Sequence, residues 1–273
     1  MLKRFIRKNV LEKLPPNWQL LLFRNYFYWL KGDYVKPEVD TFRKLCDPAK
    51  AALDIGANEG LYSMYLCRFA TRLHCFEPLP WMAGHLEKKF RDVKNVVIKN
   101  CALGGKNETA TIRIPVTQGK QYDTRSSLVG NFDGQLINGE KVLAVKDLSV
   151  EVKRLDDFRL DNLGFIKIDV EGFELEVLKG GFETITRNRP NLFIEIEQKH
   201  HQGDTPITAI FDFILKMGYA GFFEYEGRLL SLAKFDAGRH QSMTNDGARN
   251  CYCCNFIFLP SHAADVRRLG FKQ

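Results

Sequence analysis

The chain has 273 residues and a net charge of +7, and 45% of its residues are hydrophobic and 12% aromatic. This length fits one large domain or one domain with appendages, and this composition excludes disorder as the dominant state. Residues 1–50 carry eleven Lys and Arg against five Asp and Glu, so most of the positive charge lies in this segment. The remainder is close to neutral, which argues against a nucleic-acid-binding surface.

The seven cysteines are an odd number and mostly scattered, which is typical of reduced thiols in a reducing cytoplasm. Cys251, Cys253 and Cys254 lie close together, but no second Cys/His pair follows at zinc spacing, so we interpret them as strand cysteines. No run reaches the roughly 18 apolar residues of a membrane span, and the basic start lacks a signal cleavage site. We therefore expect a cytoplasmic protein.

The first 48 residues are expected to form a basic, aromatic helical extension. Apolar residues of the segment 2–14 share one helical face, and Pro15-Pro16 ends that helix because proline lacks a backbone donor. A second segment, 18–30, is rich in Trp, Tyr and Phe. Cationic aromatic helices can lie in an anionic bilayer surface, so residues 1–31 are expected to contact the inner membrane face, to pack across the domain as a lid, or to do both.

Residues 49–260 alternate short apolar runs with helical stretches, which predicts a mainly parallel sheet with helices on both faces. Strands are expected at 51–55, 72–77, 95–102, 164–170, 191–197, 219–225 and 252–259, and helices at 60–70, 80–91, 173–187 and 206–217. A longer insertion, 104–160, holds an expected strand at 109–115, a polar stretch at 117–139 and a β-like run at 142–153. Residues 205–260 close the sheet, and 261–273 form a tail.

A glycine-containing turn follows the first expected strand. Asp54-Ile-Gly56-Ala-Asn-Glu-Gly60 places an acid at the strand end and two glycines four residues apart, so that backbone can approach a ligand closely. Glu77 ends the second strand, where an acid commonly accepts hydrogen bonds from ribose hydroxyls. The spacing differs from the Gly-x-Gly-x-x-Gly of dinucleotide binders and suits a ligand without a pyrophosphate. S-adenosylmethionine is such a ligand.

Charged residues also end the fourth expected strand. Lys167, Asp169 and Glu171 share one side of this strand, and such groups are costly inside a covered parallel sheet unless they are paired or lie at its carboxyl end. We expect Asp169 to reach the reaction crevice, with Gly172 allowing the turn; the alternative is a cap of the next helix. Lys167 is expected either to pair with Asp169 or Glu195 or to act directly in catalysis.

Acids and histidines follow the next strand. Glu195, Glu197, His200 and His201 offer groups that can deprotonate a hydroxyl or bind a divalent cation, although a histidine pair there is more often a solvated loop. We assign no metal. Asp169, Glu195 and the histidines remain open as the general base.

Six short motifs together resemble the FkbM family of S-adenosylmethionine-dependent methyltransferases over about residues 50–200. In chain order they are Asp54-Ile-Gly-Ala-Asn-Glu-Gly60, Phe76-Glu-Pro78, Cys101-Ala-Leu-Gly104, Ser126-Ser-Leu128, Leu155-Asp-Asp157 and Ile168-Asp-Val-Glu-Gly-Phe-Glu174. The resemblance implies a class I, Rossmann-like methyltransferase fold with a seven-stranded sheet. It also implies O-methylation of hydroxyls on sugars, glycolipids or natural products.

With this resemblance, three sets of site residues are expected. The catalytic candidates are Asp169, Lys167 and Glu195. The expected contacts to S-adenosylmethionine are Asp54, Gly56, Ala57, Asn58, Gly60, Glu77, Pro78, Cys101, Ala102 and Asp169, and the expected substrate contacts are Ser126, Ser127, Glu171 and His200. For Ser126 and Ser127, an ordinary polar loop is the alternative.

We expect the acceptor to be a small molecule or glycan with a hydroxyl. The sequence supports two alternatives less well than this one: a methyltransferase that acts on nucleic acid or protein, and a non-catalytic binding protein with the same fold. Against the first, the basic charge is confined to the N-terminal segment, and the Asn/Asp-Pro-Pro-Tyr/Phe tetrapeptide is absent after the fourth strand. Against the second, the acids and glycines of the expected cofactor site are all present, but a fold alone never establishes activity.

Overall fold

The computed structural model describes residues 38–118, 120–123, 126–129, 132, 136–137, 139–201, 206–242 and 252–261. The expected helices of residues 2–14 and 18–30, with their lid or membrane role, lie outside the described residues, as does the tail after residue 261. In the described part of the chain, no helix is long and apolar enough to cross a membrane.

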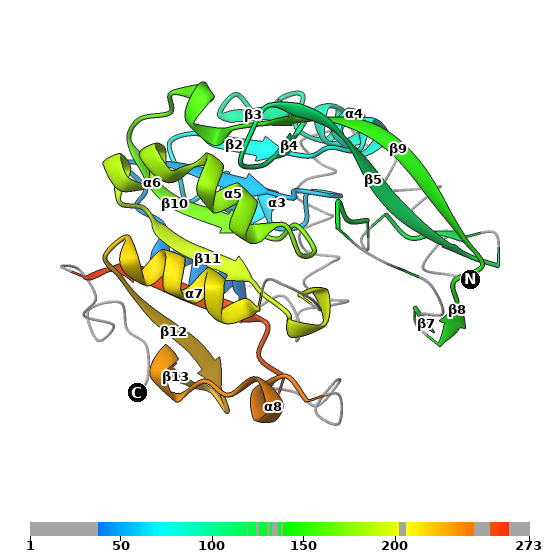
Figure 1. The fold of residues 1–273 in the computed structure, drawn as a ribbon. Helices are drawn as coiled ribbons and strands as arrows, with labels where there is room; N and C mark the ends of the chain where they lie inside the picture. The colour runs from blue at the N-terminus through cyan, green and yellow to red at the C-terminus, as the bar shows by residue number, and fades with distance from the viewer. Residues whose placement is uncertain are drawn as a thin grey trace.

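An eight-stranded sheet forms the centre of the molecule (Figure 1). Its order is β13-β12-β14-β11-β10-β1-β2-β3. The strands are β1 (Ala51–Ile55), β2 (Leu73–Phe76), β3 (Val96–Lys99), β10 (Leu163–Ile168), β11 (Asn191–Glu195), β12 (Tyr219–Tyr225), β13 (Arg228–Ser231) and β14 (Asn255–Pro260). From β3 to β11 all neighbours are parallel, and β14 runs antiparallel between β11 and β12.

Seven of these strands are the seven expected from the sequence, and the mainly parallel sheet is confirmed. The eighth, β13, pairs with β12 as an antiparallel edge hairpin. Its four residues alternate weakly, and only Leu229 among them is buried, so the apolar signal was too short to read. The expected strand 95–102 is also divided, because β4 (Ala102–Leu103) leaves the central sheet to pair with β9 (Ala144–Lys153).

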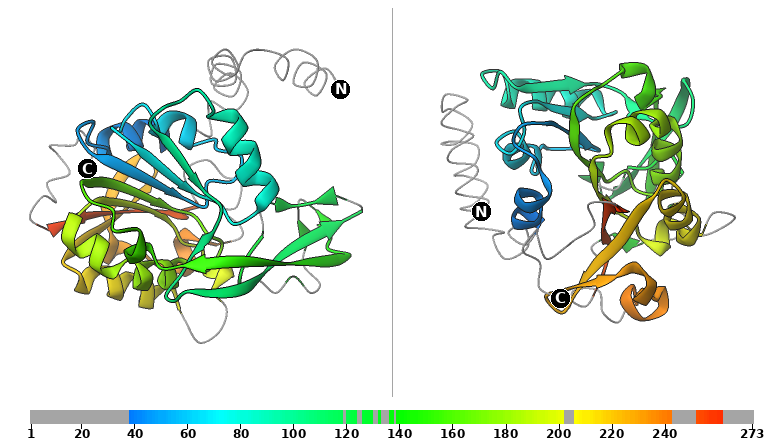
Figure 2. Two further views of the ribbon diagram at one scale, coloured as in Figure 1. Left: turned by 90° about the horizontal axis from the view of Figure 1, so that it is seen from above. Right: turned by 90° about the vertical axis from the view of Figure 1, so that its left-hand side faces the viewer.

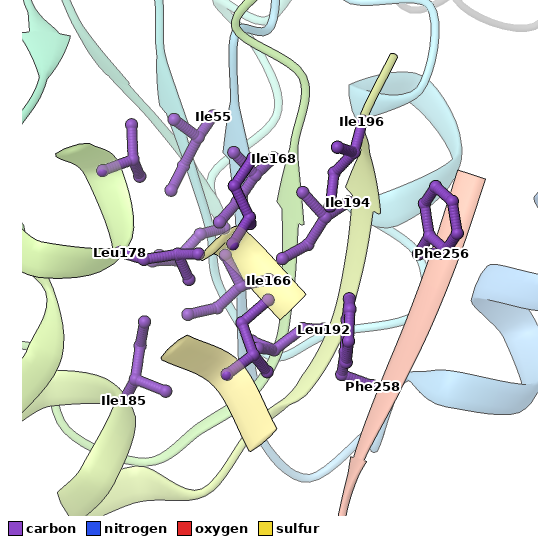
Figure 3. Packing of buried hydrophobic residues seen from close by; sticks show 14 of the residues in the cluster. Ile55, Ile166, Ile168, Leu178, Ile185, Leu192, Ile194, Ile196, Phe256 and Phe258 are labelled. Carbon is purple, nitrogen blue, oxygen red and sulfur yellow. The ribbon is translucent and has the colours of Figure 1, made fainter. Parts of the chain in front are cut away.

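Helices cover both faces of the sheet, which explains why β1 and β10 are buried along their whole length. One face carries α5 (Glu174–Gly180), α6 (Phe182–Asn188) and α7 (Ile207–Lys216), as the view from above shows (Figure 2, left). Leu178 and Ile185 from these helices meet isoleucines of β1, β10 and β11 (Figure 3).

The opposite face carries helix 38–45, α3 (Ser63–Leu66) and α4 (Pro80–Lys89). Phe42 is fully buried and packs edge-on against Phe193, and it also contacts the Phe165 ring. Because successive side chains of a strand alternate between faces, Lys167 points to the same face as Phe165. The helix 38–45 therefore lies on the side of the sheet to which Lys167 points.

Two expected helices differ in extent. The expected helix 60–70 keeps α-helical geometry only over Ser63–Leu66, and the expected helix 173–187 is divided into α5 and α6 at Gly180-Gly181. A Cβ at Gly180 would lie 1.9 Å from the carbonyl oxygen of Gly104, so only glycine allows this close packing against the start of the insertion.

The insertion forms a second, four-stranded sheet, β4-β9-β5-β6. Its long strands β5 (Glu108–Thr117) and β9 pair antiparallel over nine residues each and project from the central sheet (Figure 1). The two short strands β7 (Leu136–Ile137) and β8 (Glu140–Lys141) form a separate pair, and β6 (Lys120–Gln121) ends the larger sheet. The short helix α8 (Ala237–His240) precedes β14.

Candidate active site

A cavity of about 410 Å³ opens at the carboxyl ends of β1, β2, β10 and β11, with the insertion along one side. This is where open parallel sheets bind ligands, and the size is in the range of small-molecule sites. The lining residues are Ile55, Gly56, Ala57, Asn58, Glu59, Leu61, Tyr62, Met64, Phe76, Glu77, Pro78, His85, Lys89, Cys101, Ala102, Leu103, Ile112, Asp123, Ser126, Ser127, Leu128, Lys167, Asp169, Val170, Glu171, Phe173, Glu195 and Glu197.

Most of the expected site residues lie on this cavity. Three do not: Asp54, Gly60 and His200. The sequence did not indicate that the apolar residues Phe76, Leu103 and Ile112 line the cavity, because a residue of a cavity wall looks the same in sequence as a residue of the hydrophobic core. It also did not indicate Tyr62 and Asp123, because polar residues of loops are common outside binding sites.

The turn after β1 approaches the strand-end turn of β10 at backbone contact distance. Gly56 has φ +79°, and a Cβ there would lie 1.8 Å from the carbonyl oxygen of Asp169. Only glycine fits both the left-handed conformation and this contact. Gly60 has φ +74°, and its Cβ would lie 2.5 Å from Leu86. The two glycines therefore set the shape of the turn, and the first brings it against Asp169.

Glu77 is buried at the end of β2 and lines the cavity. Its carboxylate accepts hydrogen bonds from the backbone N–H of Asn58 (2.8 Å) and Leu79 (2.9 Å). Burial raises the pKa of Glu77 to about 7, although these two donors oppose the rise. An acid held at this point by the glycine turn fits the role of ribose acceptor.

Lys167 is nearly fully buried and has two carboxylate partners. Its Nζ lies 3.2 Å from Asp169 Oδ2 and 3.4 Å from Asp54 Oδ1. Of the two expected roles of Lys167, the structure shows the pairing with Asp169. Asp54 is 1% exposed and also accepts a hydrogen bond from Ser63 Oγ at 2.5 Å. Asp54 thus lies beneath the turn, where it neutralises Lys167.

Asp169 and Glu195 bring two carboxyl groups to the cavity from neighbouring strands. Asp169 accepts from Lys167, and no side chain caps helix α5 in the structure. The backbone of Glu195 pairs with Asn255 of β14, but its carboxyl group forms no hydrogen bond or ion pair within the described part of the chain. Burial, and next the charge of Asp169, raise the pKa of Glu195 well above its usual range.

A cluster of Glu171, Glu197 and His200 borders the cavity. His200 Nε2 lies 3.0 Å from Glu171 Oε2 and 3.5 Å from Glu197 Oε1. These three side chains offer one metal-ligand atom each within 4.8 Å of one another. Glu197 is also paired with Lys199 Nζ (2.6 Å) and accepts from Tyr252 OH (2.7 Å). Because Lys199 and His200 neutralise the acids, we treat the cluster as an ion-pair network.

His200 does not line the cavity itself, but it contacts Glu171, which does. Burial lowers the pKa of His200, but the nearby carboxylates of Glu171 and Glu197 outweigh it and raise that pKa to about 9. Glu171 has φ +53°, and Ser127 Oγ donates to its carbonyl oxygen at 2.6 Å. The insertion and His200 therefore hold the Glu171 turn from two sides. His201, by contrast, pairs with Glu174 at 3.0 Å.

The residues on this cavity fit S-adenosylmethionine. The glycine turn leaves space for backbone contact, the Glu77 carboxylate can accept hydrogen bonds from ribose hydroxyls, and Phe76, Leu103 and Ile112 offer apolar surface to an adenine ring. The strand order, in which the antiparallel strand β14 lies between β11 and β12, together with this cavity defines a class I S-adenosylmethionine-dependent methyltransferase.

Comparison with known proteins supports this class and narrows it. Residues 54–220 match the model of the methyltransferase FkbM domain, so the chain belongs to the FkbM methyltransferase family. The 2-O-methyltransferase NoeI of Sinorhizobium fredii is 27% identical over 175 residues, which cover 61% of this chain and 72% of the relative. Methyltransferase 1 of Beauveria bassiana is 24% identical over 141 residues, 47% of this chain and 57% of that protein.

Among solved structures, the methyltransferase FkbM from Methylobacillus flagellatus is similar, with 17% sequence identity and a TM-score of 0.49. The match covers 78% of this chain and 44% of that protein.

Proposed function

We propose that this methyltransferase transfers the methyl group to a hydroxyl of a sugar, in a glycan, a glycolipid or a related metabolite. The observation that carries the proposal is the pair of carboxyl groups, Asp169 and Glu195, on the cavity wall at neighbouring strand ends. An alcohol is a poor nucleophile while it keeps its proton, so O-methylation gains from a base at this edge. The O-methyltransferase named among the relatives supports the same reaction.

Each part of the site has one task in this reaction. When bound, S-adenosylmethionine supplies a methyl group on a positively charged sulfur. The Gly56 turn and Glu77 hold and orient the cofactor, and orientation alone can lower a barrier by several kcal/mol. With the cofactor bound, Glu195 would accept the proton of the acceptor hydroxyl, whose oxygen takes the methyl group. Its raised pKa makes it a stronger base than an ordinary carboxylate.

Asp169 orients the acceptor beside Glu195, and Lys167 fixes Asp169 in place. Ser126, Ser127 and Glu171 lie on the same cavity from the insertion and the β10 turn, so we assign them to the acceptor side. His200 acts on the acceptor only through Glu171.

An acceptor panel tests this function. The protein is incubated with S-adenosylmethionine labelled in its methyl group and with neutral oligosaccharides, a peptide mixture, or RNA. We expect alkali-stable label in the sugar fraction and, after acid hydrolysis, a mono-O-methyl sugar by mass spectrometry. Label in RNA or peptide with none in any sugar would refute the proposal, and the same oligosaccharides with all hydroxyls methylated serve as the matched control.

A further inference from the structure

Three segments that are distant in sequence meet behind the cavity wall, at the side chains of Glu38, Tyr62 and Asn255. The Tyr62 hydroxyl donates to Glu38 Oε2, and Asn255 Nδ2 donates to Glu38 Oε1 at 2.9 Å. Both oxygens of the Glu38 carboxylate are thus engaged. Glu38 lies on helix 38–45 and Asn255 on β14, both outside the residues 54–220 that match the family model.

Tyr62 connects this group to the site. It lines the cavity, and the Nζ of Lys167 lies 5.1 Å from the centroid of its ring. A cation at this distance from an aromatic face is attracted to it. Phe42 supports the same ring edge-on at 5.3 Å. Lys167 therefore has Asp54, Asp169 and the Tyr62 ring as neighbours, and the position of Tyr62 limits where its ammonium can go.

Packing of helix 38–45 does not require an acid at position 38. Val39, Phe42 and Leu45 already bury the helix against the sheet. Placing a carboxylate here carries a desolvation cost that hydrogen bonds only partly offset. Glu38 interacts electrostatically with five charged or titratable groups: Tyr62, Lys167, Asp169, Glu195 and Cys254. Helix packing alone therefore does not explain an acid at position 38.

We propose that Glu38 is a positioning residue for methyl transfer: it fixes Tyr62 against Lys167, and so holds the Asp169 carboxylate at the wall of the cavity. The proposal depends on methyl transfer from S-adenosylmethionine and not on which acceptor is used. It gives the chain before the family domain a part in the reaction.

The test compares binding of S-adenosylmethionine and S-adenosylhomocysteine by calorimetry. The two differ by the methyl group and by the positive charge on sulfur. The negative charge of Asp169 at the cavity wall therefore favours binding of S-adenosylmethionine over S-adenosylhomocysteine. Glu38→Ala removes both acceptors of Tyr62 and Asn255. Glu38→Gln keeps an acceptor for Tyr62, and the Asn255 amide can turn to present its oxygen. Lys44→Ala, an exposed residue of the same helix, is the control.

We expect Glu38→Ala to lower the ratio of the two affinities about fivefold, and Glu38→Gln and Lys44→Ala to keep it within about twofold. Tyr62→Phe, which keeps the ring and loses only the hydroxyl, should lower the ratio in the same direction and carries the test if Glu38→Ala does not fold. An unchanged ratio in Tyr62→Phe and in a folded Glu38→Ala would overturn the proposal. Equal losses in Glu38→Gln and Glu38→Ala would also overturn it, because charge and not position would then be the cause. Melting temperatures, measured in parallel, separate these effects from loss of fold.

Discussion

The ammonium of Lys167 lies 3.2 Å from the carboxylate of Asp169, and this pair joins the interior of the sheet to the cavity wall. The Lys167 side chain is 3% exposed, whereas that of Asp169 is 27% exposed. Burial lowers the pKa of Lys167, but the charges of Asp169 and Asp54 more than reverse this, so its pKa is raised. A buried cation here thus compensates two acids, only one of which reaches the cavity.

Replacing Lys167 by methionine should strongly destabilise the fold. The change keeps the side-chain length but leaves Asp54 buried without its cation, and breaking a buried pair from one side typically lowers the free energy of unfolding by about 3–5 kcal/mol. Urea unfolding measures this loss. Lys179→Met is the control, because its pair with Glu176 is exposed and such pairs contribute about 0–1 kcal/mol. A loss no larger than that of the control would show that Asp54 does not need Lys167.

The Gly56 position gives a second, local prediction. Gly56→Ala places a Cβ 1.8 Å from the Asp169 carbonyl oxygen at a φ of +79°, so the turn must move and S-adenosylhomocysteine should bind at least about tenfold more weakly. Gly84→Ala in helix α4 is the matched control, since nothing lies within 4 Å of its added Cβ. Alanine there should raise stability by up to about 1 kcal/mol. Calorimetry and thermal melts check both, and unimpaired binding by Gly56→Ala would refute the close contact.

The sequence predicted the parts of this structure that depend on local pattern. The seven strands followed from short apolar runs, and the turn at Gly56 followed from residue types that only a close backbone approach requires. The parts that depend on contacts between distant segments were beyond it. Nothing in the sequence near Glu38 indicates that it meets Tyr62 and Asn255, because this meeting requires the helix 38–45 and β14 to lie beside the same turn.

Site chemistry was predicted in the same uneven way. Asp169 and Glu195 line the cavity, as the sequence predicted, because ligand sites of open parallel sheets lie at the carboxyl ends of the strands. Asp54 carries an equally strong pattern, yet its carboxylate lies under the turn with Ser63 and Lys167. A strand end alone does not tell which face of the turn receives the side chain.

The contributions of Glu77 and His200 to stability should fall as pH rises from about 5 to 9. Burial raises the pKa of Glu77 to about 7, so the folded state binds more protons than the unfolded state between pH 4.5 and 7, and stability decreases through that window. The pKa of His200 is raised to about 9 by Glu171 and Glu197. Its contribution is fully present below pH 6.5 and is lost as pH rises through 9.

Melting temperatures across this pH range check the two windows separately. Glu77→Gln should flatten the lower part of the profile, and His200→Gln the upper part. Glu183→Gln, at an exposed position, should leave the whole profile parallel to that of the unaltered protein. If the profiles of Glu77→Gln and His200→Gln both run parallel to that of the unaltered protein, the assignment of both groups is wrong.

The proton acceptor can be tested once a sugar acceptor is in hand. Glu195 is the carboxyl group on the cavity with a strongly raised pKa and no partner in the described part of the chain, so we expect the turnover number to rise with pH until Glu195 is deprotonated. Glu195→Gln should lower the turnover number about 10²–10⁴-fold and remove this rise, while binding of S-adenosylhomocysteine stays within about threefold. Asp169→Asn provides the comparison: it should also slow turnover, but the pH-dependent rise should remain because the base is still present. If the rise disappears in Asp169→Asn and persists in Glu195→Gln, the two carboxyl groups have the opposite roles.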